Sequence, residues 1–189
     1  YRKHADEANA VVAKAKEMGR KGLAIKADVS SYDDAQNMVD TVIKEFGSLD
    51  IMVCNAGINW DGVIWKMTEE QWDSVINVNL KGYFNYNKAA AELFKEQKYG
   101  KIVNISSATV QQGFHGLLPY TSSKAAQMSN TRGLSQALGR YNITVNATKD
   151  GYTTNSSSYN LTVENNMFLT LTLDMTNPIS SCQNLTSSG

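Results

Sequence analysis

The chain has 189 residues, enough for one domain with a substantial hydrophobic core. Lys and Arg number 18, as do Asp and Glu, so the balanced charge gives no reason to expect nucleic acid or an anionic membrane as a partner. No apolar run approaches the roughly 18–20 residues that a membrane-spanning helix needs. The first residues form a polar helical pattern and the two cysteines, Cys54 and Cys182, lie far apart. We therefore expect no signal peptide, no disulfide and a cytoplasmic protein.

The first third of the chain alternates between helical and strand patterns. Residues 8–18 carry apolar side chains at helical spacing, and a glycine follows as a stop signal. Residues 23–29 alternate in polarity, which predicts a short strand. Residues 31–47 predict a second helix, with Ser31 as its N-cap and Asp34 at the capping-box spacing.

The same alternation continues through the middle of the chain. The apolar run at residues 51–54 predicts a strand buried on both faces of a parallel sheet. A capping box then opens a helix that runs from residue 68 toward residue 94. Residues 101–106 predict the next strand, residues 120–138 a helix, and residues 143–146 a further strand.

Strands separated by helices are typical of an α/β fold with a parallel sheet, in which ligands bind beyond the carboxyl ends of the strands. We assign residues 1–146 to such a domain. Residues 147–189 are rich in Asn, Ser and Thr and are predicted to form a poorly ordered tail. Glycosylation-type triplets begin in this tail at Asn155, Asn160 and Asn184, and one begins at Asn104 in a predicted buried strand. Such triplets are common by chance in this composition, so we do not expect glycosylation.

Three residues with proton-transfer chemistry lie near the start of the helix at 120–138. Tyr120 and Lys124 stand four residues apart and share one helix face. A free tyrosine has a pKa near about 10, and a neighbouring ammonium stabilises its phenolate. Ser107 follows the preceding strand, where its hydroxyl can bind a substrate oxygen. A Tyr-x-x-x-Lys pair alone is common by chance, so its interpretation depends on the surrounding motifs.

Those motifs occur in order along the chain: Asp28-Val29, Asn55-Ala56-Gly57, Asn79, Ile105-Ser106-Ser107, Tyr120 with Lys124, and Ile143-Thr144-Val145-Asn146. Through them, residues 1–146 resemble the classical short-chain dehydrogenase/reductase family. The resemblance implies a Rossmann-like doubly wound parallel sheet and hydride transfer between a nicotinamide and a carbonyl carbon. It departs at Cys54, where the family often has an asparagine.

The resemblance also implies a role for each catalytic residue. Tyr120 would protonate the developing alkoxide, and Ser107 would hold the same oxygen through a hydrogen bond. Lys124 would lower the tyrosine pKa and bind the nicotinamide ribose. Asn79 would position a water in the proton relay.

The cofactor-binding residues implied in the same way are Arg2, Asp28, Val29, Asn55, Ala56, Gly57, Tyr120, Lys124 and Gly151. Arg2 stands where an arginine can pair with a 2′-phosphate, so we expect NADP(H) rather than NAD(H). We expect no metal site.

The sequence departs from the family at both ends. No Thr-Gly-x-x-x-Gly-x-Gly element is present, so we expect an incomplete sheet that lacks the family's first strand, glycine loop and first helix. Asp150-Gly151-Tyr152 stands where the family usually has Pro-Gly-Tyr. Our hypothesis is that the chain is a fragment or a mis-assembled gene product.

The stretch at residues 56–76 most resembles 3-oxoacyl-[acyl-carrier-protein] reductases, which implies a 3-oxoacyl thioester substrate and a place in fatty acid biosynthesis. The parent enzyme is expected to be a dimer or tetramer, paired through the helices at 68–94 and 120–138. Small residues at 89–91 and 125–126 would permit close packing there. Two alternatives remain: a catalytically inactive subunit that only pairs with homologues, and a secreted, glycosylated interaction protein.

Overall fold

A computed structural model describes residues 1–149 and 152–153 of the chain. The chain divides into two compact units, residues 1–152 and 153–189. The first unit contains every described candidate site residue. Gly151 and residues 154–189, with the three Asn-headed triplets of the predicted tail, lie outside the described residues. The prediction of a poorly ordered tail from residue 147 is wrong at residues 147–149 and 152–153, which form strand.

The first helix forms where the apolar spacing predicts it. Helix α1 spans Ala5–Glu17, with acidic residues in its first turn and basic residues in its last, an arrangement that complements the helix dipole. Gly19 follows in the left-handed region at φ 73°, a conformation that glycine adopts without strain. None of the residues of α1 is buried, so this helix contributes no side chain to the core.

The predicted strand at residues 23–29 is wrong, because no strand forms there. The backbone instead makes two hydrogen bonds to Tyr1: the amino terminus of Tyr1 donates to the Ile25 carbonyl, and the Ala27 amide donates to the Tyr1 carbonyl, each at 2.9 Å. A strand needs a hydrogen-bonded neighbour along its length, and alternating polarity does not supply one. Within the described residues, the backbone of Ile25 and Ala27 pairs with Tyr1 alone, which is too short a neighbour to form a strand.

Helix α2 spans Tyr32–Phe46 and confirms both of its predicted ends. The Ser31 hydroxyl accepts a hydrogen bond from the Asp34 amide at 3.2 Å, which caps the first turn. Gly47 ends the helix at φ 85°. Ala35 and Val39 are buried, which anchors the helix to the core.

The strands are β1 (Ile51–Cys54), β2 (Gly100–Ile105), β3 (Ile143–Lys149) and β4 (Tyr152–Thr153), in the sheet order β1-β2-β3-β4. Strands β1 and β2 are parallel, with Ile51 opposite Lys101, and β2 and β3 are parallel, with Gly100 opposite Ile143. The carboxyl ends of these three strands therefore meet at one edge. This arrangement confirms the predicted α/β class with a parallel sheet.

The longer helices are α3 (Glu69–Ile76), α4 (Gly82–Gln97) and α6 (Leu118–Leu138); the short elements are η1 (Ile64–Lys66), α5 (Thr109–Gln112) and η3 (Gly139–Tyr141). Thr68 and Gln71 form the predicted capping box at the start of α3. A π-helical turn, η2 (Asn77–Lys81), joins α3 to α4, so the helix continues toward Phe94 as expected. Over the described part of the chain, no helix has the length and apolarity needed to cross a membrane.

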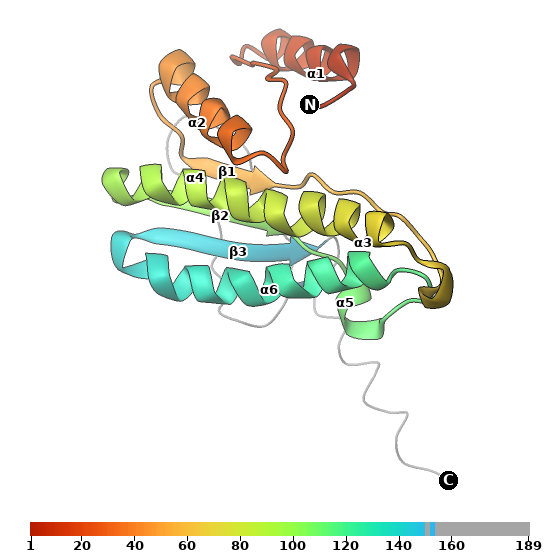
Figure 1. The fold of residues 1–189 in the computed structure, drawn as a ribbon. Helices are drawn as coiled ribbons and strands as arrows, with labels where there is room; N and C mark the ends of the chain where they lie inside the picture. The colour runs from red at the N-terminus through yellow and green to blue at the C-terminus, as the bar shows by residue number, and fades with distance from the viewer. Residues whose placement is uncertain (150–151, 154–189) are drawn as a thin grey trace. The chain divides into compact units, whose positions relative to one another are not determined.

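The core lies between the sheet and the helices of one face. Helix α4 packs on β1 and β2, α6 packs on β3, and α2 packs against α4 (Figure 1). Phe94 and Ile102 are fully buried at the centre of this layer. The sheet edge that holds the carboxyl ends of the strands is thus held rigidly by the helices behind it.

Strand β1 is buried on one face only. Met52 and Cys54 are 5% and 7% exposed, whereas Val53 between them is 49% exposed. Side chains alternate between the two faces of a strand, so Val53 points to the face opposite α4. The prediction that this strand is buried on both faces is therefore wrong at Val53. Strand β1 lies at the edge of the described sheet, and helix α4 packs on the face that holds Met52 and Cys54.

Candidate active site

Tyr120 and Lys124 occupy the first turns of α6. The Lys124 side-chain nitrogen lies 5.8 Å from the centroid of the Tyr120 ring, so the two side chains share one helix face as their spacing predicts. Lys124 is only 3% exposed. Burial disfavours the charged ammonium and lowers the pKa of Lys124 to about 8.

Two oxygens hold the Lys124 ammonium at the carboxyl end of β2. It donates a hydrogen bond to the Ile105 carbonyl at 2.7 Å and another to the Tyr83 hydroxyl at 3.2 Å. The Tyr83 hydroxyl in turn donates to the same Ile105 carbonyl at 3.0 Å. Tyr83 was not predicted as a site residue from the sequence. Its position four residues after Asn79 on the same helical run was the available signal.

Ser107 follows β2 directly. Its hydroxyl oxygen accepts hydrogen bonds from the amide and the hydroxyl of Thr109, at 3.3 and 3.0 Å. The neighbouring Ser106 hydroxyl donates to the Lys124 carbonyl at 3.4 Å. This bond ties the end of β2 to the helix that holds Tyr120 and Lys124, so the three predicted residues come from two adjoining elements.

Asn79 is fully buried in η2 and joins three segments. Its side-chain oxygen accepts from the Ile58 amide, and its side-chain nitrogen donates to the Ile58 carbonyl, each at 2.8 Å. The same nitrogen lies 3.4 Å from the Ser123 hydroxyl on α6. The Asn79 carbonyl accepts a hydrogen bond from the Gln127 side-chain amide. Asn79 thus fixes the loop after β1 against α6.

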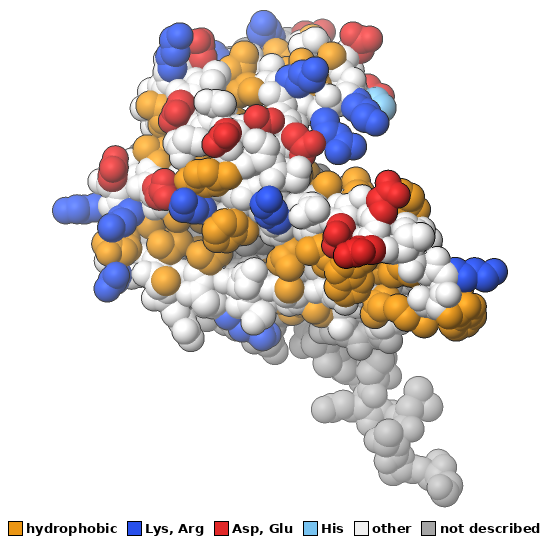
Figure 2. Space-filling model, viewed as in Figure 1, with side chains coloured by type: hydrophobic (Ala, Val, Ile, Leu, Met, Phe, Trp, Pro, Cys, Tyr) orange, Lys and Arg blue, Asp and Glu red, His pale blue; other side chains and the backbone are white. Residues whose placement is uncertain are grey.

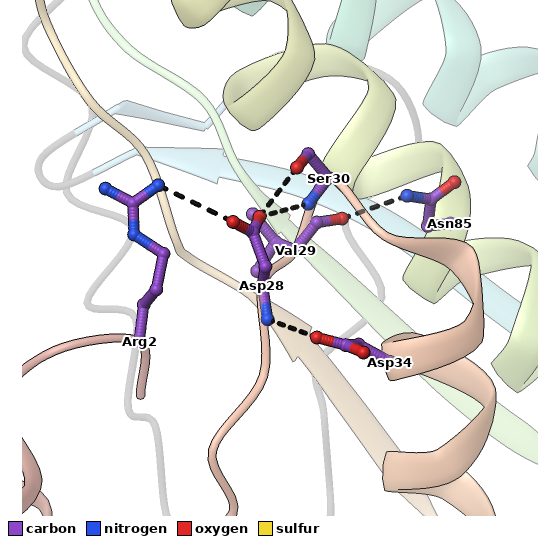
Figure 3. A network of polar contacts seen from close by, with 6 residues as sticks. All are labelled: Arg2, Asp28, Val29, Ser30, Asp34 and Asn85. Carbon is purple, nitrogen blue, oxygen red and sulfur yellow. Dashed lines mark hydrogen bonds and ion pairs between the residues drawn. The ribbon is translucent and has the colours of Figure 1, made fainter.

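Asp28 forms a second polar cluster with Ser30 and Arg2 (Figure 3). One Asp28 carboxylate oxygen accepts from the Ser30 hydroxyl at 2.7 Å and from the Ser30 amide at 2.9 Å. The other lies 3.6 Å from the Arg2 guanidinium. The two Ser30 hydrogen bonds, and to a lesser extent Arg2, hold the pKa of Asp28 below its ordinary value.

The backbone around Asp28 and Val29 is docked on two helices. The Asp28 amide donates to the Asp34 carboxylate at 2.7 Å, and the Asn85 side chain donates to the Val29 carbonyl at 2.9 Å (Figure 3). Asn85 follows Asn79 by six residues on one continuous helical run. That spacing separates the two asparagines by on the order of 9 Å along the helix. One helical run therefore organises both clusters of predicted site residues.

The remaining predicted residues lie at the end of β1. Asn55, Ala56 and Gly57 follow this strand and are exposed. A Cβ atom on Gly57 would lie 3.3 Å from the Asn79 side-chain oxygen, so the glycine permits the close approach of loop and helix. Cys54 is a buried free thiol. Burial raises its pKa to about 12, and the thiol donates to the Asn87 side-chain oxygen at 3.3 Å.

The described residues fit a dinucleotide in part. Asp28 and Val29 form a hydrogen-bonding corner suited to an adenosine, and Tyr120 and Lys124 offer polar groups at the opposite cluster. A glycine-rich turn between a strand and a helix, which would cradle a pyrophosphate, is not found within residues 1–149. The described residues therefore include polar groups compatible with the two ends of a dinucleotide, and within residues 1–149 they include no phosphate cradle.

A parallel sheet with helices packed on it and with polar residues at the carboxyl ends of its strands defines the α/β class, whose ligands bind at those strand ends. The family model described as short chain dehydrogenase matches residues 1–166. The chain belongs to this family, as its motifs predict.

Similar proteins agree with this assignment. The 3-oxoacyl-[acyl-carrier-protein] reductase FabG of Staphylococcus aureus (strain Mu50) is 38% identical over 147 residues, covering 78% of this chain and 60% of the relative. The 3-oxoacyl-[acyl-carrier-protein] reductase of Synechocystis is 33% identical over 164 residues, covering 87% of this chain and 66% of the relative.

A crystal structure of a short chain dehydrogenase from Mycobacterium avium is 34% identical, with a TM-score of 0.70, and covers 74% of this chain and 51% of that chain. The chain thus spans about 60% of the length of the first curated relatives it matches. The predicted resemblance to 3-oxoacyl-[acyl-carrier-protein] reductases is confirmed.

Proposed function

We propose that the chain carries the catalytic residues of a nicotinamide-dependent oxidoreductase that reduces a ketone to an alcohol. The observation that supports this most directly is the buried Lys124 ammonium, one helical turn after Tyr120 and beside the strand end that precedes Ser107. A positive charge at this place stabilises negative charge that develops on a neighbouring oxygen. Membership of the short-chain dehydrogenase family supports the same reaction class.

In the proposed mechanism, Ser107 donates a hydrogen bond to the carbonyl oxygen of the substrate. Tyr120 gives its hydroxyl proton to that oxygen as the carbon accepts a hydride, and the ketone becomes an alcohol. A bound NADP(H) would supply the hydride. Lys124 stabilises the tyrosinate left behind, and Asn79 holds the loop after β1 in place for the cofactor.

We assign the cofactor preference to NADP(H) on the basis of Arg2. Its side chain is about half exposed, and the Asp28 carboxylate orients its guanidinium at 3.6 Å. An oriented, exposed guanidinium is suited to a 2′-phosphate. Asp28, Val29 and the segment from Asn55 to Gly57 would hold the rest of the adenosine and the ribose.

The substrate we propose is a 3-oxoacyl thioester. The support is the similarity to two proteins whose names specify 3-oxoacyl-[acyl-carrier-protein] reductase, at 38% and 33% identity. The reaction would then reduce the 3-oxo group of the acyl chain. A cytoplasmic location and a role in fatty acid biosynthesis remain predictions.

We also propose that the parent protein is a homo-oligomer. Apolar side chains lie on the surface along α3, α4 and the loop before them (Figure 2); the exposed ones include Ile64, Trp65, Trp72 and Phe84. Phe84, 58% exposed in the first turn of α4, is suited to a subunit contact. The expectation that Ala89 and Ala90 permit subunit packing is wrong, because both are buried in the core of this chain.

The alternative function, an inactive subunit that only pairs with homologues, remains a prediction. The two functions differ in catalysis and not in assembly, so one assay separates them.

The test is an assay of the purified full-length chain with NADPH and a 3-oxoacyl thioester. Turnover should fall by about 100-fold or more in Tyr120→Phe, because that variant loses the proton donor. Tyr99→Phe, which alters a half-exposed tyrosine after α4, is the matched control and should keep full activity. A chain without any turnover or NADPH binding, yet able to associate with an active homologue, supports the inactive subunit instead.

A further inference from the structure

Tyr83 is a buried titratable residue to which the proposed mechanism gives no role. It lies on α4, is 4% exposed, and places its hydroxyl within hydrogen-bond distance of the Lys124 ammonium. The Lys124 nitrogen also lies 4.9 Å from the centroid of the Tyr83 ring, nearer than the 5.8 Å to the Tyr120 ring. Lys124 therefore sits between two tyrosines, one from its own helix and one from α4.

Core packing alone does not explain the hydroxyl group of Tyr83. A phenylalanine would fill the same apolar space without the cost of burying a polar group. Here the hydroxyl is satisfied on both sides, because it donates to the Ile105 carbonyl and accepts from Lys124. The lysine donates to the same carbonyl at 2.7 Å, so the three groups form a closed triangle.

We propose that Tyr83 is a positioning residue that sets the place and the charge of the Lys124 ammonium. The inference rests on the proposed catalytic role of Lys124 and deepens it. The Tyr83 oxygen and the Ile105 carbonyl are two acceptors fixed on separate elements, α4 and β2. Because they hold the ammonium from one side, they determine its distance from Tyr120 and favour its protonated form.

The titratable groups around this triangle are few in the described structure. Tyr120 approaches from α6 and Cys54 from β1. The Cys54 thiol, with its pKa raised to about 12, stays neutral through the range in which Lys124 titrates. Burial also raises the pKa of Tyr83, so its hydroxyl remains protonated beside the ammonium. The Gln127 side chain, which also lies beside the Tyr83 hydroxyl, is uncharged.

The test is the pKa of Lys124 in Tyr83→Phe, which removes one oxygen and keeps the ring. The full-length chain is labelled with lysine that carries 13C at Cε, and NMR of the Lys124 resonance across pH 6 to 11 gives the titration. Losing an acceptor of the charged form should lower the pKa of Lys124 by about one unit. Tyr86→Phe, a partly buried tyrosine three residues further along α4, is the matched control and should leave the titration unchanged.

An unchanged or raised Lys124 pKa in Tyr83→Phe overturns the proposal. If this variant does not fold, 3-fluorotyrosine at position 83 replaces it. The fluorine weakens the oxygen as an acceptor, so a smaller fall is expected, and no fall again overturns the proposal. The labelling needs neither cofactor nor turnover, so an inactive wild-type chain contradicts the proposed function without deciding this result. In an active chain, the pH profile of kcat/KM should shift in the same direction.

Discussion

Asn79 clamps the backbone of Ile58 at both of its polar groups, accepting from the amide and donating to the carbonyl at 2.8 Å each. This two-point contact holds the loop after β1 against the helical run that also positions Asn85 and Tyr83. A single buried amide side chain therefore links the segment from Asn55 to Gly57 with the candidate catalytic helix.

Removing this clamp should destabilise the protein and loosen the loop. In Asn79→Ala, both Ile58 groups lose their partner, and we expect the free energy of unfolding to fall by about 3 kcal/mol. Amide hydrogen exchange at Ile58 should accelerate well before global unfolding. Asn77→Ala, at an exposed position of the same turn, is the control and should change stability by less than about 0.5 kcal/mol. Equal losses in the two variants would contradict the clamp.

The acidity of Asp28 should depend more on Ser30 than on Arg2. Hydrogen bonds from Ser30 are the larger cause of its lowered pKa, and the Arg2 charge is the smaller one. Carbon-13 NMR titration of the carboxyl should therefore show a larger rise of the Asp28 pKa in Ser30→Ala than in Arg2→Ala. The reverse order would show that the ion pair dominates.

The lowered pKa of Asp28 should make the free energy of unfolding depend on pH in acid. A carboxyl group with a folded-state pKa below its unfolded value stabilises the fold above the unfolded value. That contribution disappears as the pH falls through the folded value. In Asp28→Asn the acid-side loss of stability should therefore be shallower below about pH 4, as measured by urea unfolding at each pH. A profile parallel to that of the wild type would contradict this linkage.

Lys124 should give the opposite slope at alkaline pH. Its folded-state pKa of about 8 lies below the ordinary 10.5, so between these values the unfolded chain binds more protons than the folded one. Stability attributable to Lys124 therefore rises with pH across this window. Relative to Lys124→Met, the wild type should gain about 3 kcal/mol of unfolding free energy from pH 7 to pH 10.5. A constant difference between the two proteins would show that Lys124 titrates normally.

Substitution by alanine should destabilise the protein at Gly100 and not at Gly139. A Cβ atom on Gly100 would lie 2.1 Å from a ring carbon of the fully buried Phe94, whereas one on Gly139 would meet nothing within 4 Å. Gly100→Ala should lower the free energy of unfolding by about 3 kcal/mol through overpacking. Gly139 has helical backbone angles, so Gly139→Ala should leave the free energy of unfolding unchanged or raise it by up to about 1 kcal/mol. Thermal unfolding of both variants tests this contrast, and equal Tm values would contradict it.

Helix ends were the most predictable features because their causes are local. The Ser31 cap depends on one hydroxyl and one amide three residues later, and the Thr68 capping box depends on a reciprocal pair with Gln71. Both contacts lie within four residues of chain. The Thr68 box formed as predicted, whereas only the Ser31 half of the box expected with Asp34 formed, because the Asp34 carboxylate accepts from the Asp28 amide instead. The strand at residues 23–29 did not form, because a strand is defined by a neighbour that its own residues do not specify.

The candidate site divides in the same way. Tyr120 and Lys124 were predictable because their spacing places them on one helix face. Tyr83 and Gln127 were not predictable, because their hydrogen-bond partners lie on other elements that only the folded chain brings close. Val53 was predicted to be buried from its apolar run, yet its exposure depends on which elements cover each face of β1.

By itself, the sequence determined the order of the longer helices and of strands β1 to β3, the helix caps at Ser31 and Thr68, the family and the identity of the candidate catalytic residues. These follow from interactions over a few residues or from motifs at regular spacing. Only the tertiary structure decided that Lys124 is buried, that the Ile105 carbonyl and Tyr83 hold its ammonium, and that Asn79 binds the backbone of Ile58. The pKa of a buried charge and the partners of a buried amide depend on groups far apart in the chain, which only the folded sheet and helices bring together.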